Sequence, residues 1–100
     1  AREMREDTRR MRDAEVRLML AEWGSARAQG ARIRDEMIPL ARARTEAALA
    51  AYRGGSAPIA MVLEARRAEL ESELALLSME QVVARAWAWL ANTVHTPGQS

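Results

Sequence analysis

The sequence contains no cysteine, which excludes disulfides, thiolate metal sites and thiol catalysis. Its only histidine is His95, so neither a histidine-based triad nor a multi-histidine metal site can be built. Lysine is absent, and no apolar run approaches the roughly 20 residues that a helix needs to cross a bilayer. We therefore predict that the chain is not an enzyme, has no cofactor or metal and does not itself span a membrane.

The composition instead favours helix. Apolar residues make up 49% of the chain, but there is no phenylalanine and much of that share is alanine, so few large side chains are available for a compact core. Strong helix formers dominate and β-branched residues are scarce, which predicts an all-α protein. The net charge is +1, with both signs interleaved, so we expect no nucleic acid partner.

The first predicted helix covers about residues 2–53. Its apolar or small residues recur at intervals of three and four, interrupted at Arg44, and are typical of a coiled-coil stripe. They are Met19, Trp23, Ala26, Gly30, Ile33, Met37, Leu40, Ala47 and Ala51. Pro39 removes a backbone donor, so the helix either bends or breaks there. We favour a continuous bent helix, because the stripe continues in phase through Met37 to Leu40.

The second predicted helix covers about residues 58–93. One face carries Leu63, Leu70, Leu74, Leu77, Ala84 and Ala88. Between the helices, Gly54, Gly55 and Ser56 give the backbone freedom to turn, and Pro58 suits the first turn of the next helix. The sequence thus predicts a long antiparallel two-helix coiled-coil hairpin over residues 1–93, with its turn at 54–57 and a disordered tail at 94–100. The first sixteen residues then have no partner within the chain.

Other candidate functional residues have simpler interpretations. Glutamates 69, 71, 73 and 80 are expected to be solvated rather than catalytic, and the six scattered methionines to fill gaps rather than bind soft metals. Trp87 and Trp89 are two residues apart and so point to different helix faces. We expect one to pack near Trp23 and the other to be left for a partner.

The turn region carries the most specific pattern. Tyr52 and Gly55 form a Tyr-x-x-Gly pattern, followed by Ser56 and then by Val-Leu-Glu-Ala at residues 62–65 and by Arg67. Two segments further upstream match the same family pattern: Ile-Pro-Leu-Ala at residues 38–41 and Ala-Glu-Trp at residues 21–23. Over about residues 14–90 the chain resembles the TolC-like family of outer-membrane efflux proteins, most closely its heavy-metal and cation efflux branch.

That resemblance implies a parent protein that forms a trimer, with a β-barrel in the outer membrane of a Gram-negative bacterium and an α-helical tunnel in the periplasm. This chain would be the C-terminal periplasmic hairpin. Its turn would meet a periplasmic adaptor (membrane fusion) protein, which connects it indirectly to an inner-membrane pump of the RND type. Metal cations or drugs would then leave through the tunnel, giving heavy-metal resistance.

The resemblance also implies site residues. The adaptor-docking tip would comprise Arg53, Gly54, Gly55, Ser56, Pro58, Ile59, Val62 and Leu63, the last three packing behind the turn. Tyr52 and Glu64 would lie near the tunnel entrance, with Glu64 in an acidic ring made by symmetry. The simpler interpretation of Glu64 is a solvated or arginine-paired carboxylate. Ala60 and Met61 depart from the family pattern, in which a second acid is common, and weaken the expected acidic gate.

A second interpretation belongs to another class. The hairpin could be a free-standing coiled-coil interaction module that dimerises into a four-helix bundle. Residues upstream of Ala1 would decide, because the efflux interpretation requires β-strands, a second related hairpin and a secretory signal. On its own, the chain is expected to bury its exposed apolar stripe by associating into a dimer or higher oligomer.

Overall fold

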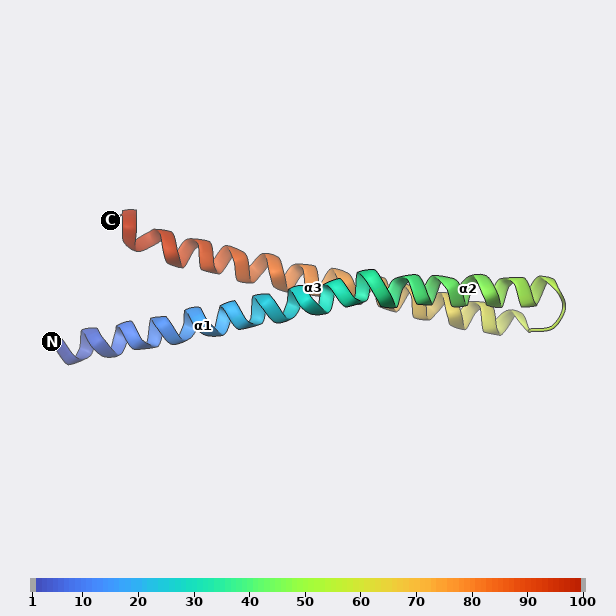
Figure 1. Ribbon diagram of the computed structural model, residues 1–100, viewed down its shortest axis with the longest axis horizontal. Coiled ribbons are helices and arrows are strands. Elements are labelled where there is room, and N and C mark those ends of the chain that lie inside the picture. The colour runs from blue at the N-terminus through green and yellow to red at the C-terminus, as the bar shows by residue number, and fades with distance from the viewer. Residues whose placement is uncertain (1, 100) are drawn as a thin grey trace.

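The chain is a long helical hairpin. In the computed structural model, which describes the backbone of residues 2–99 and the side chains of residues 3–93, the elements are α1 (Arg2–Arg32), the π-helical turn η1 (Ile33–Met37), α2 (Ile38–Arg53) and α3 (Ile59–Gln99). The first three form one continuous arm, and α3 returns antiparallel beside it (Figure 1). The molecule measures 77 × 23 × 17 Å. The predicted all-α antiparallel hairpin is therefore confirmed.

The two arms lie close together near the turn and diverge toward the chain ends (Figure 1). Side chains 3–15 are all exposed, as predicted for a segment without a partner in this chain. The backbone of α3 is helical to Gln99, beyond the end near Thr93 that the sequence predicts. The side chains of residues 94–100 lie outside the described part, and the disordered tail expected there stays a prediction.

The seam between the arms is thin and made largely of small residues. Buried residues of the first arm are Ala26, Gly30, Ile38 and Ala41, and α3 contributes Glu69 and Ala86. At Gly30 the helices approach closely, since a Cβ added there would lie 3.6 Å from Cβ of Met79. With no large side chain fully buried among the described residues, the hairpin depends on the length of its seam rather than on a deep core.

The π-helical turn explains how the first arm passes Pro39. The N–H of Ile38 donates to the carbonyl of Ile33, five residues back rather than four. In a regular α-helix the Pro39 ring would crowd the carbonyl of Asp35, and the wider turn gives it room. The arm therefore continues through Pro39, as predicted.

The π turn also corrects the predicted stripe. Inserting one extra residue into a turn rotates the following helix relative to the preceding one. Ile38 and Ala41 are consequently buried, whereas Met37 and Leu40 are 50% and 52% exposed. The prediction that the stripe continues in phase through Met37 and Leu40 is wrong. The sequence signal for the shift is Arg44, the one charged residue that interrupts the predicted stripe.

The predicted seam of α3 is also wrong. Its four leucines, Leu63, Leu70, Leu74 and Leu77, are between 44% and 64% exposed. A different face packs against the first arm, with buried or half-buried Val62, Ala65, Glu69, Leu76, Val83 and Ala86. Both faces recur at intervals of three and four, so periodicity alone cannot say which meets the partner. Smaller side chains at the seam let the helix axes approach more closely.

Candidate docking tip and interhelical groove

The predicted turn ends α2 with a Schellman motif. Gly55 has a φ of +79°, in the left-handed region that favours glycine. Its N–H donates to the carbonyl of Tyr52 at 3.0 Å, and the N–H of Ser56 donates to the carbonyl of Ala51 at 2.9 Å. These two bonds satisfy carbonyls that the end of a helix would otherwise leave unpaired.

The start of α3 is likewise determined by residues next to it in the sequence. Pro58 precedes Ile59, the first helical residue, and its carbonyl accepts a hydrogen bond from the N–H of Met61 at 3.1 Å. The hydroxyl of Ser56 donates to the carbonyl of Ala51 at 3.2 Å. The tip is therefore fixed by its own backbone chemistry, as the Gly-Gly-Ser and proline pattern predicts.

Only part of the predicted packing behind the turn is found. Val62 is half-buried, but Ile59 is 47% exposed and Leu63 is among the most exposed leucines. Met61 and Tyr52 are exposed as well. The expectation that Ile59 and Leu63 pack inward is thus incorrect, because both lie on faces of α3 that no other element covers. The tip presents apolar surface to the outside.

The remaining predicted site residues lie at the same end of the hairpin. Arg53, Gly54 and Glu64 are exposed, and Glu64 makes no ion pair within the described residues. Tyr52 and Glu64 come from opposite arms. An acidic ring needs further copies of the chain, so the roles of these residues at a tunnel entrance stay predictions.

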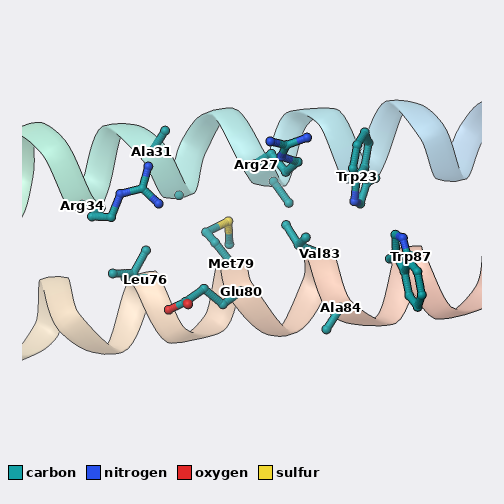
Figure 2. Close-up of a pocket in the computed structure, with 12 residues that line it drawn as sticks. Trp23, Arg27, Ala31, Arg34, Leu76, Met79, Glu80, Val83, Ala84 and Trp87 are labelled. Atoms are coloured by element: carbon teal, nitrogen blue, oxygen red, sulfur yellow. The ribbon is translucent and has the colours of Figure 1, made fainter.

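A groove between the first arm, over α1 and η1, and α3 is a feature that sequence reasoning missed (Figure 2). It has a volume of about 590 Å³. Its lining residues are Trp23, Ala26, Arg27, Gly30, Ala31, Arg34, Leu76, Met79, Glu80, Val83, Ala84 and Trp87. Trp23 and Trp87 lie at one end, on opposite walls, and Arg34 lies at the other (Figure 2). The signal that could have found it is the run of small residues that follows Trp23 in α1, together with Trp87 on the facing helix.

The two arginines that line the groove are already engaged. The guanidinium of Arg27 lies 4.8 Å from the ring centre of Trp23, a cation–π contact. Arg34 donates to Asp35 at 3.1 Å, and this hydrogen bond, with the charges of Asp35 and Glu80, raises the pKa of Arg34. Trp87 lines the groove opposite Trp23 and is 62% exposed, whereas Trp89 is half-buried, so the expectation that the tryptophan away from Trp23 is left for a partner stays a prediction. The groove can receive apolar side chains but offers no nucleophile or acid–base pair among the described residues that line it.

The glutamates of α3 differ from one another. Glu69 is buried at the seam and hydrogen-bonded to Arg66, so the expectation that it is solvated is wrong. Glu71 is exposed and lies 3.4 Å from Arg67, whereas Glu73 meets Arg42 of the facing arm at 3.8 Å. Among the described residues, no three acidic or histidine side chains gather as a metal site would require.

Comparisons with family models, curated proteins and solved structures find no match to this chain. None of the described helices has an apolar stretch long enough to cross a bilayer. The resemblance to the TolC-like family therefore depends on the sequence patterns alone.

Proposed function

We propose that this chain is the periplasmic helical hairpin of a trimeric outer-membrane efflux channel. Its tip docks with the hairpin of a periplasmic adaptor protein in a tripartite pump that exports metal cations or drugs. The Tyr-x-x-Gly and Val-Leu-Glu-Ala patterns at the tip support this function. So does the shape, because a hairpin 77 Å long can reach far from a membrane-anchored barrel.

The observation that carries the proposal is apolar surface left uncovered on both arms. Met4, Met11 and Leu18 are exposed along α1 at intervals of seven, and Leu63, Leu70 and Leu77 along α3 at the same intervals. An amphipathic helix in a self-sufficient hairpin needs one apolar stripe, facing its partner. A helix in the wall of a tunnel has neighbours on two sides and needs two apolar stripes, one for each neighbour.

The tip suits a helical partner. The Schellman motif holds the backbone in one conformation, so docking would cost little ordering of the loop. Around it, Tyr52, Ile59 and Met61 offer apolar contacts, and Arg53 offers a charge at the edge. In this proposal Tyr52 and Glu64 face the tunnel entrance, where carboxylates repeated by symmetry favour cations.

The proposal is tested in cells that depend on the full-length parent for tolerance to metal salts and drugs. Ile59→Asp places a charge in the apolar tip without touching the turn, since Ile59 is exposed and outside the Schellman motif. We expect tolerance to fall to the level of cells lacking the parent, with the amount of outer-membrane trimer unchanged.

The matched control is Gln29→Glu, which adds the same charge at an exposed residue of α1, far from the tip. Gln29 belongs to neither set of exposed apolar residues, so the control should leave both the trimer and the adaptor contact intact. Normal tolerance in the Ile59→Asp strain would refute docking at this tip.

The second candidate is the free-standing coiled-coil module. The exposed leucines of α3 favour it, because their intervals of seven are those of a helix that pairs with another helix. Strands and a second hairpin upstream of Ala1 would favour the efflux channel over this candidate.

A further inference from the structure

One face of α3 carries an apolar surface that no element of this chain covers. Leu63, Leu70, Leu74 and Leu77, here called the leucine ridge, are 63%, 44%, 64% and 56% exposed. They lie outside the seam, which uses Val62, Leu76 and their neighbours. A contiguous ridge of this kind marks an interaction surface.

Three of the four ridge leucines are spaced symmetrically about Leu70, whereas the symmetric counterpart of Leu74 is Arg66. Leu63 lies seven residues before Leu70, and Leu77 lies seven after. If a second α3 runs antiparallel with the two Leu70 side chains opposite each other, Leu63 of each copy meets Leu77 of the other. Shifting this register by one heptad leaves fewer leucine pairs.

The charges beside the ridge have the same symmetry. Arg66 and Arg67 are consecutive, about 100° apart around the helix, and so flank the ridge on its two sides. Glu73 shares the side of Arg66, and Glu71 shares the side of Arg67. A twofold axis at Leu70 would bring Arg66 to within about 1.5 Å of the level of Glu73 in the other copy, and Arg67 to within about 3 Å of the level of Glu71.

Of these two charge pairs, the one formed by Arg67 and Glu71 is the more accessible to a second copy. Arg67 and Glu71 pair within one helix at 3.4 Å, and their side chains are 82% and 67% exposed. The Arg67 guanidinium of a second copy can therefore also reach the carboxylate of Glu71. Exposed pairs add little affinity, but matched charges select one orientation over its alternatives. In a parallel, in-register pair, like charges would face each other across the ridge.

We propose that a second copy of this chain packs antiparallel across the leucine ridge, with Leu70 of both copies at the twofold axis. The contact is isologous, because each copy uses the same patch. This inference does not rest on the efflux proposal. The two proposals give the ridge different occupants, because the hairpins of a trimeric tunnel all run in the same direction and no antiparallel second copy can lie there; the pairing belongs to the free-standing module. The tip of each copy would also lie beside residues 82–85 of the other, so self-association and docking at the tip would exclude each other.

Cysteine cross-linking tests the orientation directly, because the chain has no cysteine of its own. Leu63→Cys and Leu77→Cys are prepared separately, mixed, and oxidised. The antiparallel pair predicts the mixed disulfide at about tenfold excess over either disulfide between identical copies. Two thiols at position 63 would lie about 20 Å apart along the paired helices, beyond the reach of a disulfide. Leu18→Cys, an equally exposed leucine of α1, is the control and should not cross-link with either.

Sedimentation over a range of concentrations tests the ridge itself. Leu70→Glu should weaken association at least about tenfold while leaving the helical content unchanged, because Leu70 lies outside the seam. Leu18→Glu should leave association unchanged. A chain that stays monomeric at every concentration, Leu63→Cys that cross-links to itself as in a parallel pair, or association insensitive to Leu70→Glu would each overturn the proposal. In each case the tip experiment on Ile59 would still decide the efflux proposal independently.

Discussion

At the scale of single residues, Gly55 fixes the turn of the hairpin. Its positive φ closes the Schellman motif, and the two hydrogen bonds of that motif set the direction in which the chain leaves α2. The neighbouring Gly54 has an ordinary φ of −80° and ends the helix without this requirement. The two glycines of the turn are therefore not equivalent.

Gly55→Ala should lower the free energy of unfolding by about 1–2 kcal/mol, because an alanine is strained in the left-handed region. Gly24→Ala is the matched control. It lies inside α1 with nothing within 4 Å of an added Cβ, so it should raise the free energy by about 0.5–1 kcal/mol. Urea unfolding followed by circular dichroism, at one protein concentration, measures both. Equal effects of the two substitutions would contradict the assigned role of Gly55.

Residue chemistry made the turn predictable, because glycine and proline act through their own backbones. It did not reveal the burial of Glu69, since a glutamate in a stretch as rich in charge as residues 64–73 has the pattern of a solvated face. Arg66, three residues earlier, supplies the partner that makes this burial tolerable. Whether a carboxylate is buried depends on which face of α3 meets the first arm, and that is decided by packing.

At the scale of secondary structure, the π turn at Ile33–Met37 sets the register of the hairpin. It accommodates Pro39 and also brings Ile38 and Ala41 into the seam in place of Met37 and Leu40. Closing the turn would rotate α2 and bring Arg44 toward the seam. The turn is thus required both by the proline and by the sequence of α2.

Deleting Glu36 removes the extra residue of the turn and leaves Pro39 inside a regular α-helix. We expect this deletion to lower the free energy of unfolding by about 3 kcal/mol. Adding Pro39→Ala should restore most of the loss, because the helix can then continue with Ile38 and Ala41 still facing α3. Urea unfolding of the two variants is the measurement. A doubly altered chain as unstable as the single deletion would show that the π turn has another cause.

The existence and direction of both arms could be predicted because the periodic segments are long and interrupted only once by turn residues. The faces by which the two arms meet at the seam could not be predicted. In α3 the leucines and the smaller residues both follow helical spacing, and the larger side chains were the natural choice for a core. In the first arm, Arg44 marked the change of phase, but only the π turn explains how one helix can change face without breaking.

At the scale of the whole molecule, the hairpin has more apolar surface than its two arms can cover. The seam takes one face of each arm, and the leucine ridge and the exposed residues of α1 are left outside. The groove with Trp23 and Trp87 adds a concave surface along the seam. Uncovered apolar surface of this kind is what the proposed place of the hairpin in a larger helical assembly would require.

The central claim, a hairpin whose tip lies in the periplasm, is tested most directly by labelling Ser56→Cys in the full-length parent, in a background without other cysteines. Ser56 is exposed at the tip. A membrane-impermeant maleimide should label it once the outer membrane is permeabilised and the inner membrane is left intact. Labelling that appears only after the inner membrane is disrupted would contradict the account and favour an interaction module inside the cell.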